Sequence, residues 1–171
     1  MGREIRRVPL GWEHPKKEYP NHRAMRMEES YQPLYDKDYE SACAEWKKEF
    51  AEWENGERER VRMEHGDDLE YWDWDGMPPD KDYYRPKWSE EEMNGFAVYE
   101  TVSEGTPVTP AFATRDELID YLVEHGDFWD QKRGDGGWTR ENATAFVGRG
   151  FAMSGMFNTA TGEFKAARDG A

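Results

Sequence analysis

The sequence has few of the residues that build disulfide and metal sites. Its 171 residues include a single cysteine, Cys43, which excludes an internal disulfide framework and any zinc site made from several cysteines. Such usage is typical of a reducing cytosol. The histidines form no HExxH, HxH or His-Cys pattern, and we expect no metal and no cofactor. They are His14, His22, His65 and His125.

Long hydrophobic runs are also missing. No stretch of about 18 apolar residues could span a bilayer, and no short apolar segment follows the basic N-terminus as in a secretory leader. We therefore expect a soluble protein that stays in the cytoplasm and does not bind a membrane.

Motifs of catalysis are absent as well. The glycine-containing segments GRGFAMSG and KRGDGGW lack the lysine and Ser/Thr of a Walker loop and the strand, glycine turn and helix of a dinucleotide site. There is no GxSxG turn or Cys-His signature, and carboxylates are too numerous for any one pair to indicate an acid and a base. We expect a protein that is not an enzyme; an enzyme on an unfamiliar scaffold would show a cleft with strongly shifted titrating groups.

Aromatic residues decide whether this chain folds. Apolar residues make up only 36% of the chain and charged residues 35%, but 15% are Phe, Trp or Tyr. Each ring buries a large area, so rings can form a core where aliphatic residues are few. The chain is long enough for one compact domain without disulfides or metals.

Basic charge is scarce in the middle of the chain. The net charge is −14, distributed as +4 over residues 1–27, −12 over residues 28–80 and −6 over the remainder. An acidic surface repels nucleic-acid phosphates and anionic lipids, both of which are bound by cationic surfaces. We expect no direct binding of nucleic acid, with the arm REIRR as the one basic exception.

The clearest local pattern predicts a helix over residues 36–55. Five residues recur at steps of four, three, four and three, which places them on one stripe of a helix. They are Tyr39, Cys43, Trp46, Phe50 and Trp53. Asp36 or Asp38 can cap its start and Asn55-Gly56 can end it. The simpler interpretation is a stripe buried in the protein's own core; the alternative is a stripe offered to a partner.

The remaining patterns predict an α+β fold: a single domain over residues 36–171, with the long amphipathic helix, a small antiparallel sheet and two short helices. Residues 1–35, with four prolines, are predicted to form an extended arm with Ile5, Val8 and Trp12 docked on the core. An acidic aromatic loop is expected at residues 64–88.

Within the second half, residues 95–102 and 108–112 predict a hairpin, and FAMSGMFN and EFKA predict a second one around Thr161-Gly162. A capping box at Thr114 predicts a helix that ends at His125-Gly126. Another helix follows Trp138-Thr139, with Ala143, Phe146 and Val147 turned inward. Ser89, followed by three glutamates, is typical of a further helix start.

The segment HGDDLEYWDWDGMPPDKDYY, residues 65–84, combines acids with large rings and carries no Lys or Arg before Lys81. Its residues suit recognition of a basic protein surface, where Trp and Tyr provide contact area and carboxylates attract Lys and Arg. The alternative is a solvated surface that keeps a sparse core soluble. The candidate partner-binding residues are Glu64, Asp67, Asp68, Glu70, Trp72, Asp73, Trp74 and Asp75.

Several segments resemble a family of small uncharacterised proteins of tailed bacteriophages and prophages. They are REIRRVPLGWEHP, YQPLYDKDYESACAEW, PPDKDYYRPKW, YETVSEGTPVTPAFATRDELIDYLVEHGD and WTRENATAFVGRGFAMSGMF. The resemblance implies no activity and no catalytic residues. By analogy of charge and context, it suggests a phage protein of the anti-CRISPR or antirestriction type, which occupies the basic surface of a host nucleic-acid-binding protein in the bacterial cytoplasm. The alternative is a phage assembly protein that associates with itself.

Overall fold

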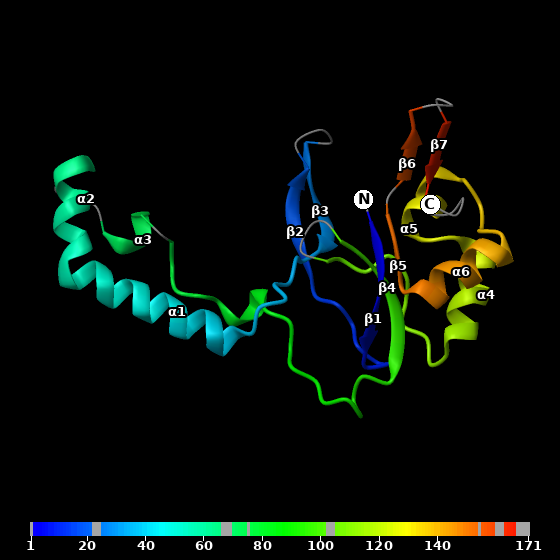
Figure 1. The fold of residues 1–171 in the computed structure, drawn as a ribbon, viewed down its shortest axis with the longest axis horizontal. Coiled ribbons are helices and arrows are strands. Elements are labelled where there is room, and N and C mark those ends of the chain that lie inside the picture. The colour runs from blue at the N-terminus through cyan, green and yellow to red at the C-terminus, as the bar shows by residue number, and fades with distance from the viewer. Residues whose placement is uncertain are drawn as a thin grey trace. The chain divides into compact units, whose positions relative to one another are not determined.

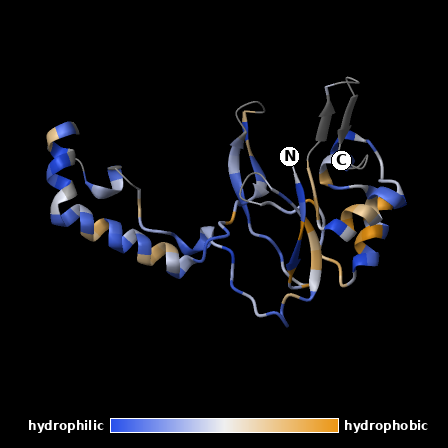
Figure 2. Ribbon diagram, in the orientation of Figure 1, coloured by the Kyte–Doolittle hydropathy of each residue, from blue (hydrophilic) through white to orange (hydrophobic). Residues whose placement is uncertain are grey.

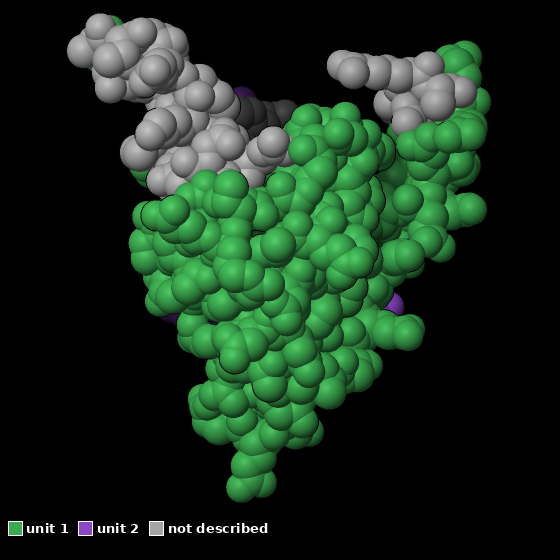
Figure 3. Space-filling model, turned by 90° about the vertical axis from the view of Figure 1, so that its right-hand side faces the viewer, with its two compact units in different colours: residues 1–33, 88–171 green, residues 34–87 purple. Residues whose placement is uncertain are grey.

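The computed structural model describes residues 2–21, 25–65, 70–74, 76–101, 105–153, 155–159 and 163–166. The chain divides into two compact units. Unit 1 comprises residues 1–33 and 88–171, and unit 2 comprises residues 34–87 (Figure 3). The expected α+β class, with a long helix and small antiparallel sheets, is confirmed.

Unit 1 is built on a three-stranded antiparallel sheet in the order β4-β1-β5 (Figure 1). The strands are β1 (Arg3–Val8), β4 (Gly95–Glu100) and β5 (Phe151–Ala152). Successive side chains of a strand point to opposite faces, so Ile5 and Val98, which are paired in register, share one face. Val8, Ala97 and Tyr99 lie on the other face and pack with Trp12 and Trp88.

The expectation of an arm at residues 1–35 is therefore wrong. Strand β1 is the central strand of the sheet and pairs with β4 on one side and β5 on the other. The prolines of this region begin at Pro9, beyond the end of β1, and so leave its backbone donors free to pair. Ile5, Val8 and Trp12 do pack on the core, as expected.

Two helices cover the Ile5 and Val98 face of the sheet. They are α4 (Arg115–His125) and α6 (Arg140–Arg149), and their hydrophobic faces stand out in Figure 2. The predicted capping box of Thr114 and Glu117 begins α4, and Gly126 ends it. Thr139 caps α6, whose Ala143, Phe146 and Val147 are buried as predicted. This is the main hydrophobic core.

A buried ionic network joins the first strand to a helix that the sequence patterns did not indicate, α5 (Phe128–Arg133). Arg3 Nε donates to Asp127 Oδ2 at 2.6 Å, and Arg3 Nη1 lies 3.5 Å from Glu100 Oε1. Asp127 also caps α5, and Asp130 accepts from the Trp138 indole at 2.6 Å. The buried carboxylates are thus satisfied by hydrogen bonds, as buried charges must be.

Two hairpins complete unit 1. Strands β2 (Lys16–Asn21) and β3 (Arg26–Tyr31) form one that was not predicted, and β6 (Gly155–Asn158) and β7 (Glu163–Ala166) form the predicted closing hairpin. Thr161 and Gly162, the expected turn, lie outside the described residues.

Two further expectations differ in detail. The return at residues 108–112 is made by isolated bridges to β4 and not by a full strand. The helix expected at Ser89 is a single turn: Ser89 and Glu92 make the bonds of a helix start, but strand β4 begins at Gly95 and leaves no room for a second turn.

Unit 2 is formed by helix α1 (Tyr39–Glu52), the wide helical turn η1 (Trp53–Glu57), α2 (Arg58–His65), α3 (Tyr71–Trp74) and η2 (Lys81–Tyr83). Asp38 caps α1 through the Ser41 N–H, as one of the two predicted caps. Gly56 adopts φ 156°, a conformation that favours glycine, and the chain continues into α2 instead of ending there.

Candidate interaction surface

The aromatic stripe of α1 is used inside unit 2. Trp46 and Phe50 stack in parallel planes with ring centroids 5.2 Å apart. Tyr71, from α3, packs against Trp46, Phe50 and Trp53 at 5.4, 5.4 and 5.6 Å. Trp53 and Tyr71 are both only 3% exposed. The simpler interpretation of the stripe, burial within the protein's own core, therefore holds for these rings.

This ring cluster fixes α3 on α1. The Trp46 indole donates to the Gly76 carbonyl at 3.2 Å, which ties down the chain beyond α3. At the start of α3, the Glu70 N–H donates to the Asp73 carboxylate at 3.2 Å and the Asp73 N–H donates to the Glu70 carbonyl at 3.0 Å. The acidic turn at 70–74 is thus held by buried rings on one side and by its own hydrogen bonds on the other.

Trp72 directly follows Tyr71 in the sequence, but its side chain lies in a different environment. The two residues are adjacent in a one-turn helix, but Tyr71 faces α1 and Trp72 remains 46% exposed. An exposed indole beside ordered carboxylates is the arrangement that favours contact with another protein. The structure therefore brings together Glu70, Trp72 and Asp73 among the candidate residues.

The other candidates are placed differently. Glu64 is exposed near the end of α2, where Arg60 lies 3.8 Å from its carboxylate. Glu70 has Arg58 at 3.6 Å. The side chain of Trp74 and the residues Asp67, Asp68 and Asp75 lie outside the described part of the chain.

These arginine pairs reduce the local charge without removing it. Both are surface pairs with roughly half-exposed partners, and pairs of this kind are weak and screened by salt. Unit 2 as a whole has seventeen acids against nine Lys and Arg, which leaves a net charge of −8. The electrostatic potential around unit 2 is therefore negative, even though single carboxylates have partners.

Two methionines add apolar area that the sequence patterns did not single out. Met63 on α2 is 82% exposed and Met77, just after α3, is 73% exposed. Methionine adapts its shape to a partner and is frequent on binding surfaces. They were not identified from the sequence, because an exposed methionine leaves no periodic signal. We call Glu64, Glu70, Trp72 and Asp73 the acidic surface; Met63 and Met77 are exposed in the same unit.

The two ends of unit 2 are joined near residues 35 and 84. The Tyr35 N–H donates to the Tyr83 carbonyl at 2.8 Å, and the Arg85 N–H donates to the Tyr35 carbonyl at 3.2 Å. The Tyr84 ring packs against Tyr35 and Tyr39 at 5.3 and 5.5 Å. The first and last residues of unit 2 are thus neighbours in the structure.

Hydrogen bonds shift the pKa values of two side chains at this end of unit 2. The Ser41 hydroxyl and N–H, and then Lys87 at 3.1 Å, hold the pKa of Asp38 well below its usual range. A hydrogen bond with Cys43 raises the pKa of Tyr39. Both effects are explained by the cap and packing of α1, so they indicate structure and not chemistry.

Among the described residues, no group of three or more His, Cys, Asp and Glu is arranged to hold a metal ion. His14 is buried in unit 1 and donates to the Gln32 carbonyl at 2.7 Å. His125 lies beside Tyr121 and Glu124 at the end of α4. The side chains of the other two histidines are outside the described part.

No helix of the described residues has both the length and the apolar character required to cross a membrane. Comparison with known proteins gave no match: no family model fits the chain, and no curated protein and no solved structure is significantly similar to it.

Proposed function

We propose that this chain is a non-enzymatic binding protein whose acidic surface in unit 2 occupies the basic surface of a nucleic-acid-binding protein. The observation that carries the proposal is the pair Tyr71 and Trp72. One ring is buried against α1 and fixes the turn, while the next ring stays exposed beside Glu70 and Asp73. Carboxylates on an ordered support steer a cationic partner, and the indole contributes contact area once it arrives.

The charge of unit 2 supports this class of partner. Acidic protein and nucleic-acid phosphates compete for the same Lys and Arg residues, so a surface of this sign blocks a nucleic-acid-binding site without binding nucleic acid itself. The resemblance to phage and prophage proteins supports a more specific version: a phage protein that inhibits a CRISPR or restriction effector in the cytoplasm of its bacterial host.

The test is competitive capture. The immobilised protein is incubated with a nuclease-treated bacterial lysate, and bound proteins are eluted with duplex DNA. We expect a nucleic-acid-binding protein that DNA releases. Trp72→Ala should lower its retention about tenfold, since an indole at the centre of an interface is a frequent hot spot. Retention of a partner that DNA does not release contradicts the proposal.

Charge reversal provides the second arm. Replacing Glu64 and Glu70 with lysine should slow association about tenfold at low salt and flatten its salt dependence. A matched variant reverses two exposed acids of unit 1, Glu18 and Glu91, and changes the net charge equally. If both variants slow association to the same extent, only the total charge matters and the acidic surface is not the site.

Sedimentation velocity distinguishes the alternative function. An inhibitor of this kind is expected to sediment as a monomer across micromolar concentrations. A concentration-dependent oligomer that persists in Trp72→Ala would favour the phage assembly protein instead.

A further inference from the structure

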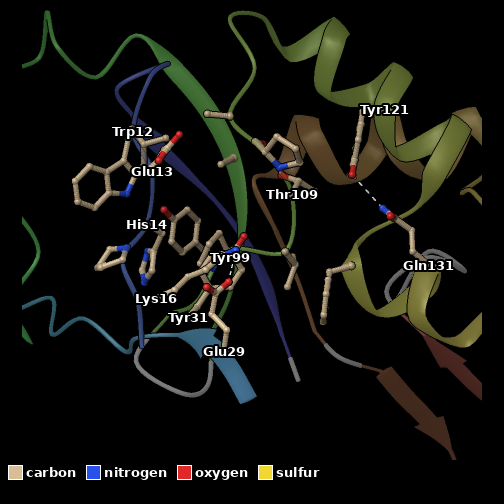
Figure 4. Close-up of a pocket in the computed structure, with 18 residues that line it drawn as sticks. Trp12, Glu13, His14, Lys16, Glu29, Tyr31, Tyr99, Thr109, Tyr121 and Gln131 are labelled. Carbon is tan, nitrogen blue, oxygen red and sulfur yellow. Dashed lines mark hydrogen bonds and ion pairs between the residues drawn. The ribbon is translucent and has the colours of Figure 1, made fainter. Parts of the chain in front are cut away.

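A cleft of about 730 Å³ lies in unit 1, away from the acidic surface in the sequence and in a different unit. Figure 4 shows the segment that leads into β2, with Trp12, His14 and Lys16, across from Tyr121 of α4 and Gln131 of α5. The volume is within the range of ligand-binding clefts. Its aromatic lining consists of Trp12, His14, Tyr31, Tyr99, Tyr121 and Phe128.

One wall of the cleft is a continuous group of rings. His14 packs edge-on against Tyr31 at 5.6 Å and Trp12 at 6.4 Å, and lies 5.9 Å from Tyr99. The bond from His14 to the Gln32 carbonyl, together with the Gln32 N–H that donates to Pro15 at 2.9 Å, fixes this wall on the hairpin. The rings are therefore held in place before any ligand arrives.

A cation of the chain itself already sits on this wall. The Lys16 ammonium lies 5.3 Å from the centre of the Tyr31 ring and 3.0 Å from Glu29 Oε1. Glu29 and Tyr31 raise the pKa of Lys16, and Glu13 adds to the effect. Glu13 and Glu29 both line the cleft; Glu29 pairs with the ammonium and Glu13 adds a second negative charge to the lining.

The cleft continues into a second hollow of about 600 Å³. The two hollows share lining residues on both walls, including Glu29 and Tyr31 of β3 and Phe128 of α5. In the second hollow the Lys132 ammonium lies 5.3 Å from the Phe128 ring and 5.7 Å from the Trp129 ring. Together they form one open groove in which each half holds an ammonium over aromatic rings.

We infer that this groove binds an extended peptide segment of a partner protein that carries spaced basic side chains. Aromatic ring faces and carboxylates attract Lys and Arg, and an open, ring-lined groove suits a chain with little conformational freedom. Lys16 and Lys132 show where a ligand's cations lie. The excess carboxylate of Glu13 and Glu29 favours a cationic ligand and opposes phosphate, which argues against single-stranded nucleic acid as the occupant.

The inference does not depend on the proposed function of unit 2. The probe is a blocked nine-residue peptide with arginine at every third position and proline elsewhere, titrated into the full chain by calorimetry. A control peptide replaces each arginine with citrulline, which keeps the shape and removes the charge. We expect the arginine peptide to bind at least about tenfold more tightly. Equal binding of the two peptides would overturn the inference.

Single substitutions locate the site. Glu13→Gln and Glu29→Gln should each weaken the arginine peptide about twofold to fivefold, the range of exposed ion pairs. Glu91→Gln, an exposed carboxylate outside the groove, should leave the affinity unchanged.

Lys16→Met should have the opposite effect on the affinity for the arginine peptide, because removing the ammonium leaves Glu29 and the Tyr31 ring accessible to the ligand. We expect binding to tighten by about threefold or more. Weaker binding in this variant would overturn the inference, and so would tighter binding of an oligothymidine than of the arginine peptide. Amide shifts in the NMR spectrum of His14, Tyr31 and Phe128 on titration are the expected signature in the wild-type chain.

Discussion

Arg3 joins the first strand to helix α5 across most of the sequence. Its side chain is 8% exposed and contacts the carboxylates of Asp127 and Glu100, which are equally buried. Arg3→Ala leaves both carboxylates buried without their cation, and breaking a pair in this way costs about 3–5 kcal/mol. Chemical denaturation measures the loss.

Arg7 on the same strand is the matched control. Its guanidinium lies 3.1 Å from Glu90 and also donates to the Met93 carbonyl, at a surface where the Arg7 side chain is half exposed and that of Glu90 largely exposed. Arg7→Ala should lower the free energy of unfolding by no more than about 1 kcal/mol. Similar losses in the two variants would mean that the buried network adds nothing beyond a surface ion pair.

Asp38 makes the stability of unit 2 depend on pH in one direction. Its folded pKa lies below the ordinary value of 3.8 because of the Ser41 hydrogen bonds and Lys87. The charge therefore stabilises the fold above that pH, and the contribution is lost as the pH falls below it. Asp38→Asn keeps a cap acceptor but removes the charge.

The measurement compares urea midpoints of wild type and Asp38→Asn at pH 7, 5 and 3. The wild type should be more stable at pH 7 and 5, and the difference should shrink at pH 3. A difference that stays constant across this range would show that the ionised carboxylate is not what matters.

The ring cluster on α1 decides whether α3 is held. Tyr71 is buried among three rings, and Tyr71→Ala should cost about 3 kcal/mol of the stability of unit 2 through the cavity it leaves. Trp72→Ala, one residue along, should change stability by less than about 0.5 kcal/mol because its ring is largely exposed. Near-UV circular dichroism and denaturant unfolding distinguish them; a large loss in Trp72→Ala would show that its indole is part of the core.

Local signals predicted the elements that local physics determines. Helices α1 and α4 begin at predicted caps and α6 begins after Thr139 as expected, because a side chain that bonds an N–H two or three residues away can be identified in the sequence. Strand β1 could not be placed, since its partners are residues 95–100 and 151–152, far along the chain. The hairpin β2–β3 was missed because KKEYPN and RMEESY show no apolar alternation.

The candidate site was predictable in composition and not in geometry. The segment of rings and acids was evident, but its one-turn helix is too short for periodicity to show that Tyr71 turns inward and Trp72 outward. The groove of unit 1 left no signal at all. Its walls come from strands β1, β3 and β4 and from residues 12–20, 106–111 and 121–132, which only the fold brings together.

The division into two units has a direct consequence for folding. Unit 2 is inserted between residues 33 and 88 of unit 1, and its two ends meet where Tyr35 and Tyr84 are bridged. Each unit has its own cluster of buried side chains: Leu118 and Phe146 belong to unit 1, and Trp53 and Tyr71 to unit 2. A unit with its own core and adjacent insertion points tolerates removal of the insert.

We therefore expect unit 1 to fold when residues 36–83 are replaced by a flexible linker. Tyr35 and Tyr84 are neighbours, so about five Gly and Ser residues, which reach at most about 17 Å, are sufficient. The shortened chain should unfold cooperatively and keep the indole N–H of Trp138 shifted by its bond to Asp130. It should also bind the arginine peptide as the full chain does, while losing the lysate partner. An unfolded product would mean that unit 1 needs unit 2 in order to fold. If the shortened chain still retained the lysate partner, the acidic surface could not be the site that binds this partner.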